Sequence, residues 1–218
     1  QYSKQYTPAE LLQMHYVPHR FTDTRGVVVI EDYASKYINI ENGRRRTVGQ
    51  PKEFKRTVHI FGGCDFFGVG MPDESTFASV LQALCNEKCP EKALKVENHA
   101  YFLWGLHDAM WYLVDSVSYA DGDIVVIPYN QRWAKFLYKN IPNVIYADVT
   151  KRRGGEMFND MWHPSENGIR TYAENLFDFL YENNFLEKME PEVLESVALA
   201  RVKQYGIPPF ADSRQLRR

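Results

Sequence analysis

Residues 57–73 read Thr-Val-His-Ile-Phe-Gly-Gly-Cys-Asp-Phe-Phe-Gly-Val-Gly-Met-Pro-Asp and carry the clearest structural signal in the chain. Its first five residues form a short apolar run of the kind found in buried strands, and two glycines end the run. Residues 76–84 then carry apolar side chains at helical spacing. The stretch therefore predicts a strand, a tight turn and a helix.

The same alternation of strand and helix patterns continues along the chain. The run Ile-Val-Val-Ile within residues 123–128 is typical of a strand buried on both faces. Further strands are predicted at residues 93–96 and 143–147, and helices at 101–117, 133–139 and, after Pro164, 168–181. This alternation predicts a doubly wound parallel sheet in a three-layer α/β/α sandwich.

The two ends of the chain differ from this pattern. Residues 1–55 mix aromatics, prolines and charges, with one clear strand at 27–30, and are expected to form an N-terminal wrapping segment. The α/β domain is then expected to span residues 56–188. Residues 189–218 are predicted to form a C-terminal helix, at 191–205, and a tail.

Composition limits the classes of function. The chain has 218 residues, of which 44% are hydrophobic and 25% charged, and a net charge of -2, so it lacks the basic excess that nucleic-acid binding needs. Its apolar runs are far shorter than the ~20 residues of a membrane span. Three cysteines are an odd count that argues for a reducing compartment, so we expect a cytoplasmic location. No signal peptide is visible, and a chain that begins with Gln1 is consistent with a piece of a larger protein.

Cys64 is the first candidate for chemistry. It follows a predicted strand of a parallel sheet, and reactive groups collect where such strands end. The surrounding glycines allow a tight turn and leave a backbone amide beside the thiol. The stretch lacks the GK[ST] of a phosphate loop and does not match the dinucleotide motif GxGxxG.

Two motifs together resemble the SGNH/GDSL hydrolases. Residues 62–73 match the pattern Gly-Gly-x-x-x-Phe-Gly-x-Gly-x-Pro-Asp, which is similar to the first motif of that family, and Asp160-Met161-Trp162-His163 is similar to its C-terminal Asp-x-x-His. The resemblance covers roughly residues 57–181, with Cys64 in the place of the usual nucleophilic serine. It implies a flavodoxin-like sandwich and an esterase or acyltransferase that needs no cofactor or metal.

The resemblance also implies the roles of individual residues. Cys64, His163 and Asp160 would form a catalytic triad, and the amides of Cys64 and Ala100 with the Asn130 side chain would form the oxyanion hole. Ala100 stands where the family has glycine. Asn130 has an alternative interpretation as a helix cap.

The spacing of Asp160 and His163 suits this chemistry, because residues three apart share one side of a helical turn and a carboxylate can then orient the imidazole. A thiolate at Cys64 could attack an acyl carbon to give a thioester. The expected substrates are acyl esters or thioesters of small molecules, glycans or carriers. The alternative is a catalytically silent SGNH-like module that binds such a ligand or scaffolds a larger protein, which the loss of serine favours.

Other conspicuous residues are interpreted as structural. Cys85 and Cys89 lie four apart, as on successive turns of a helix, without a CxxC or zinc spacing. Packing or pocket lining is favoured for His99 and His107. Pro18 argues against a metal pair at His15 and His19. The arginines at 44–46 are expected to face solvent.

Overall fold

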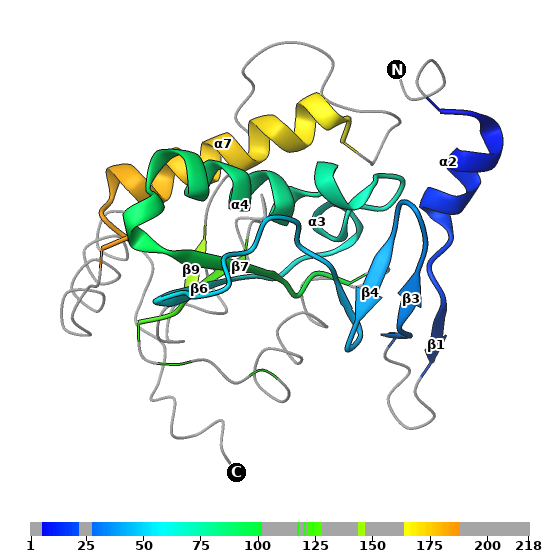
Figure 1. Cartoon of the computed structure of the whole chain (residues 1–218), viewed down its shortest axis with the longest axis horizontal. Helices are drawn as coiled ribbons and strands as arrows, with labels where there is room; N and C mark the ends of the chain where they lie inside the picture. The colour runs from blue at the N-terminus through cyan, green and yellow to red at the C-terminus, as the bar shows by residue number, and fades with distance from the viewer. Residues whose placement is uncertain are drawn as a thin grey trace, which may run out of the picture.

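The computed structural model describes residues 6–21, 28–101, 117, 120, 122–127, 144–146 and 164–187. Within them it shows a mixed α/β fold built on a parallel sheet (Figure 1). Among the described residues, no helix combines the length and the apolar character that a membrane span requires.

The sheet has four parallel strands in the spatial order β7-β6-β8-β9. The strands are β6 (Arg56–Ile60), β7 (Leu94–Asn98), β8 (Ile124–Ile127) and β9 (Val144–Tyr146). Val58 of β6 lies between Val96 of β7 and Ile124 of β8. All four residues of β8 are buried, as its unbroken run of β-branched residues predicts.

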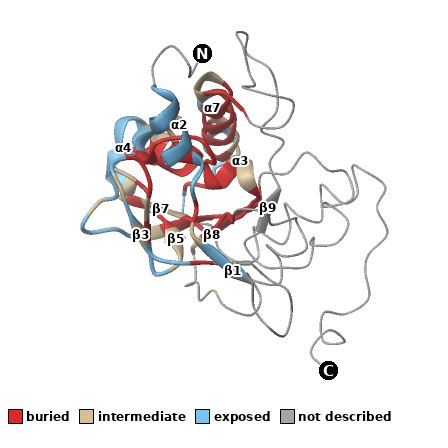
Figure 2. Ribbon diagram, turned by 90° about the vertical axis from the view of Figure 1, so that its right-hand side faces the viewer, coloured by how far each residue is buried: buried red, intermediate tan, exposed pale blue. Residues whose placement is uncertain are grey.

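Helices α4 (Phe77–Lys88) and α7 (Glu166–Glu182) lie side by side over one face of the sheet (Figure 1). Each begins at a hydroxyl cap, because the Thr76 side chain accepts the amide of Ser79 and the Ser165 side chain accepts that of Gly168. Figure 2 shows buried residues concentrated on the sheet and on the faces of these helices. This core includes Val58, Ile60, Val96, Ile124, Phe77, Leu81, Ile169, Leu176 and Leu180.

Short elements connect these pieces and precede them. The helix α3 (Cys64–Phe67) follows β6, and the 3₁₀ turns η1 (Asp73–Ser75) and η2 (Pro90–Lys92) flank α4. The N-terminal region contains α2 (Pro8–His15) and two small antiparallel sheets. One pairs β1 (His19–Phe21) with β2 (Val28–Ile30), and the other contains β3 (Tyr33–Ala34), β4 (Asn39–Glu41) and β5 (Arg44–Arg45).

The structure confirms the predicted strands and the parallel sheet, with element ends shifted by a few residues. The helix predicted at 76–84 runs on to Lys88. The helices predicted at 101–117, 133–139 and 191–205 fall mostly or wholly outside the described residues. The third layer and the domain boundaries therefore stay predictions.

Candidate active site

Cys64 lies where the central strand of the sheet ends. The chain leaves β6, turns through Gly62 and Gly63, and starts α3 at Cys64, whose side chain is half-buried. The next strand, β7, lies on one side of β6, and β8 lies on the other. Cys64 thus follows the strand at which the order of the sheet reverses, and open α/β sheets bind ligands at the carboxyl ends of their strands at such a point.

The turn is held tightly by its own backbone. The carbonyl of Gly63 accepts the amides of Phe66 and Phe67 at 3.1 and 3.0 Å, and the carbonyl of Cys64 accepts that of Gly68 at 3.0 Å. Gly68 ends α3 with a φ of 88°, which suits glycine. A β-carbon at Gly62 would lie 2.6 Å from the ring of Phe66, so the turn has no room for a side chain there.

A buried ion pair secures the loop at residues 68–73, which follows α3. The Arg45 side chain, on β5, donates to Asp73 Oδ1 at 2.7 Å, to the Met71 carbonyl at 2.7 Å and to the Gly68 carbonyl at 3.2 Å. Asp73 also accepts the backbone amide and the side-chain amide of Asn39, at 3.2 and 2.8 Å. The small sheet β3-β4-β5 is thereby bonded to the loop at residues 68–73.

The prediction that the arginines at 44–46 face solvent is wrong for Arg45, which is only 2% exposed. Arg44 is half-buried, and Arg46 is exposed as predicted. Burial lowers the pKa of the Arg45 guanidinium, while the Asp73 carboxylate opposes that shift. Asp73, the partner of Arg45, is 28 residues away in the chain, so no local sequence pattern reveals this burial.

The end of β7 is bonded to the Cys64 turn. The amide of Tyr101 donates to the Gly62 carbonyl at 3.0 Å, and Asn98 Nδ2 donates to the Phe66 carbonyl at 3.1 Å. The amide of Ala100, the predicted oxyanion donor, donates to Asn98 Oδ1 at 3.0 Å. An oxyanion would therefore have to replace the Asn98 oxygen as the acceptor of this amide.

Alanine at position 100 fits the local backbone. The non-glycine residues with positive φ in the described part of the chain are Asn42, Ala93 and Asn184. Ala100 therefore needs none of the conformational freedom of glycine.

The other predicted site residues, Asn130, Asp160 and His163, lie outside the described residues. One contact nevertheless links the neighbourhoods of the two motifs. Ser75, two residues after the last residue of the first motif, donates through Oγ to Glu166 Oε1 at 2.9 Å. Glu166 is the first residue of α7 and lies three residues after His163.

A second polar group lies on the opposite face of the sheet. In the register of β6 and β7, Ile60 pairs with Asn98 and His59 with Glu97. Asn98 contacts α3, so Ile60 and Asn98 face the Cys64 turn, and the alternation of side chains in strands turns His59 and Glu97 the other way.

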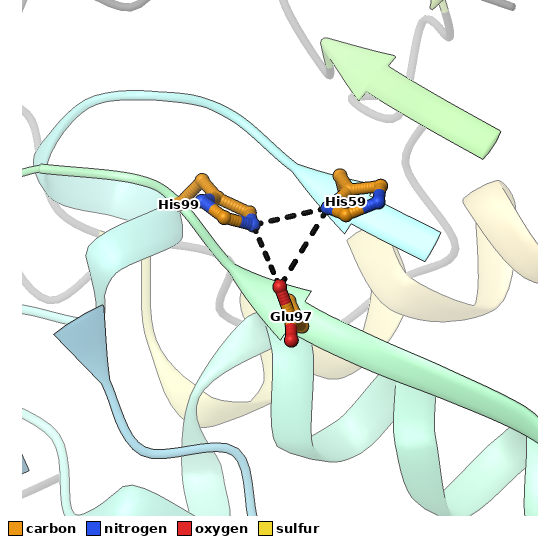
Figure 3. Close-up of side chains that lie close together, drawn as sticks. All are labelled: His59, Glu97 and His99. Atoms are coloured by element: carbon orange, nitrogen blue, oxygen red, sulfur yellow. Dashed lines mark hydrogen bonds and ion pairs between the residues drawn. The ribbon is translucent and has the colours of Figure 1, made fainter. Parts of the chain in front are cut away.

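His99 joins His59 and Glu97 on that face (Figure 3). Its Nε2 lies 3.1 Å from His59 Nδ1 and 3.0 Å from Glu97 Oε2, and its ring stacks on that of Phe61 at 5.0 Å. Burial lowers the pKa of His99 to about 4, although the hydrogen bond to Glu97 opposes this shift. The hydrogen bond from His99 lowers the pKa of Glu97, against the effect of burial, and Lys95 adds to the lowering.

His99 is buried, in keeping with the packing or pocket-lining role expected from the sequence, but its contacts with His59 and Glu97 were not predicted. The available signal was a histidine in one strand and a glutamate in the next, at positions that parallel pairing sets side by side. Among the described residues, His59, Glu97 and His99 form the group that could hold a metal ion, because their ligand atoms all lie within 4.8 Å of one another.

Comparison of the chain with models of known protein families gave no match, and comparison with curated proteins gave none either.

Proposed function

We propose that this chain is an acyl-transfer enzyme of the SGNH/GDSL type, an esterase or acyltransferase, in which Cys64 is the nucleophile. His163 would be its base and Asp160 the group that orients the imidazole. The proposal includes the full three-layer sandwich. It rests mainly on one observation, which is that Cys64 follows the central strand at the point where the sheet order reverses.

Two further features support the proposal. If the four strands of the parallel sheet are numbered 1 to 4 along the chain, their spatial order is 2-1-3-4. This is the order of flavodoxin-like doubly wound folds. The hydrogen bond between Ser75 and Glu166 joins the segment just after the first motif to the helix that begins three residues after His163. A triad requires this kind of convergence between distant segments.

The proposed reaction has two steps. The Cys64 thiol loses its proton to His163, and the sulfur attacks the acyl carbon to form a carbon–sulfur bond. The leaving alcohol or thiol departs with the proton from the imidazolium. Water or an acceptor nucleophile then attacks the thioester, giving its proton to His163, and releases the Cys64 thiolate. Asp160 stabilises the imidazolium in both steps.

One observation favours the alternative, a catalytically silent SGNH-like module. The Ala100 amide is already bonded to Asn98 Oδ1, and Asn98 is fixed in turn by its bond to the Phe66 carbonyl. A site that keeps these bonds could hold a ligand without stabilising a tetrahedral oxyanion.

The test is the pH dependence of alkylation of each cysteine by iodoacetamide, followed by peptide mass spectrometry. Cys85 and Cys89 are buried and serve as internal controls. A thiolate paired with His163 should be alkylated at pH values well below the ordinary thiol pKa of about 8.5. His163→Ala should abolish this reactivity at low pH while leaving the fold intact. An exposed but unpaired thiol would react identically in both proteins.

Turnover separates the two functions. Wild type is assayed on a panel of activated esters and thioesters beside Cys64→Ser, Cys64→Ala and Asp160→Asn. The enzyme proposal expects activity that Cys64→Ala abolishes, that Asp160→Asn lowers by orders of magnitude, and that Cys64→Ser retains on esters. If wild type is as inactive as Cys64→Ala, and His163→Ala does not change Cys64 alkylation, the silent module replaces the enzyme.

A further inference from the structure

Three donor atoms converge beside β6 and β7 (Figure 3). The strand register places them on the face of the sheet opposite the Cys64 turn. They are His59 Nδ1, Glu97 Oε2 and His99 Nε2. The two nitrogens are 3.1 Å apart, His99 Nε2 is 3.0 Å from Glu97 Oε2, and His59 Nδ1 is 3.7 Å from Glu97 Oε2.

These separations suit a tetrahedral metal ion. Zinc binds imidazole nitrogen and carboxylate oxygen at about 2.0–2.2 Å, so two ligands of a tetrahedral site lie about 3.3–3.5 Å apart. The observed distances of 3.0 to 3.7 Å bracket that value. Small movements of the three side chains would therefore be enough to admit an ion.

A second carboxylate fixes the orientation of one ligand. His59 Nε2 lies 3.2 Å from Asp123 Oδ2, and Asp123 also accepts the backbone amides of Thr57 and Ala120 at 2.8 and 2.9 Å. An anchored carboxylate can only accept, so the proton of a neutral His59 belongs on Nε2. The lone pair on Nδ1 then points at the other two donors, as in the carboxylate–histidine–metal arrangement of known sites.

Burial and charge set the conditions for binding. His59 and His99 are 4% and 1% exposed, so an ion there would be shielded from water on most sides. Two cations already neutralise Glu97, since Lys95 Nζ lies 2.7 Å from Oε1 and Arg44 lies 3.0 Å from Oε2. Lys95 occupies the oxygen that the ion does not need, whereas Arg44 competes for Oε2. The Arg44 side chain is 36% exposed and can turn into solvent.

We propose that His59, Glu97 and His99 form a binding site for a divalent transition-metal ion, with zinc as the best fit. Two imidazoles and one carboxylate select such an ion over magnesium or calcium, which prefer oxygen ligands. Within the described part of the chain these three residues make up the group, and water or an external ligand would complete a tetrahedral site. The site shares no residue with the proposed triad, so either proposal can fail without the other.

The experiment measures zinc binding to the full chain, free of any affinity tag and stripped with a chelator. Titration calorimetry and elemental analysis after dialysis give affinity and stoichiometry, and the visible spectrum with cobalt reports geometry. We expect one zinc per chain, an intense tetrahedral cobalt spectrum and no thiolate-to-cobalt charge-transfer band. Such a band would assign the metal to cysteines and overturn the proposal.

Matched variants test the residues. Glu97→Gln and His59→Gln should each weaken binding by at least 100-fold, and Asp123→Asn by about 10–100-fold, because it acts through His59. Arg44→Met should strengthen binding, since it removes the competitor for Oε2. His15→Gln, outside the cluster, should change nothing. Circular dichroism checks that each variant is folded. The proposal is overturned if the wild type takes up no zinc, or if folded Glu97→Gln and His59→Gln both bind like the wild type.

Discussion

Arg45→Met should destabilise the protein far more than the same change at the adjacent Arg46. Arg45 is buried, and its loss leaves the Asp73 carboxylate without its cation and the carbonyls of Gly68 and Met71 without their donors. Removing one partner of a buried ion pair costs about 3–5 kcal/mol. The two bonds from Asn39 to Asp73 remain and should place the loss near the lower end of that range.

The measurement is thermal and urea unfolding followed by circular dichroism. A chain of this size loses about 2–4 °C in melting temperature per kcal/mol, so a loss of about 3 kcal/mol should lower the melting temperature of Arg45→Met by roughly 6–12 °C. Arg46 is exposed, and Arg46→Met should cost less than about 0.5 kcal/mol. In a double-mutant cycle with Asp73→Asn, the two losses should fall short of additivity by about 0.5–3 kcal/mol. Equal stability of Arg45→Met and Arg46→Met would refute the reasoning.

Two other predictions concern the same region and the N-terminal helix. Gly68→Ala should destabilise the chain by at least about 2 kcal/mol. The backbone at this position has a φ of 88°, which strains alanine, and the new β-carbon would lie 2.7 Å from Thr76 Cγ2. Gly122→Ala, with a φ of 90° but its nearest contact at 3.9 Å, is the control, and chemical denaturation should show a clearly smaller loss for it. Hydrogen bonds from Tyr37, and then from Thr7, lower the pKa of Glu10 from 4.5 to about 2, so the stability that Glu10 contributes is complete above pH 4.5 and is lost as the pH falls towards 2. Acid titration of the melting temperature should therefore show a shallower decline between these pH values in Glu10→Gln, and an unchanged slope would contradict this role.

Features of the fold that depend on short-range patterns could be predicted from the sequence. The four consecutive β-branched residues of β8 favour a buried strand, and all four are buried in the structure. Helix α7 begins at a serine cap one residue after Pro164, close to the predicted start. The position of Cys64 at the end of a parallel strand followed from the two glycines after an apolar run.

What could not be predicted depends on partners that are distant in the chain. Nothing local distinguishes Arg45 from the exposed Arg46, because only the fold brings Asp73 to one of them. The histidine cluster depends on strand register, since a slip of one residue would separate His59 from Glu97. The apolar run at residues 57–61 predicts a strand, but it does not reveal which residue of the next strand His59 faces.

The register also determines how the two proposed sites relate. His59 and Glu97 point away from the face on which Asn98 contacts α3, so the backbone of β6 and β7 separates the metal donors from the Cys64 turn. An ion held by these donors would therefore lie on the opposite face of the sheet from a group bound at the turn. It would act on the turn only through the structure, because His99 donates its amide to the Ile60 carbonyl at 2.8 Å and stacks on Phe61, just before Gly62. Removal of zinc should therefore lower the melting temperature while the pH profile of Cys64 alkylation keeps its midpoint. A midpoint that moved with zinc would mean that the two sites are coupled across the sheet.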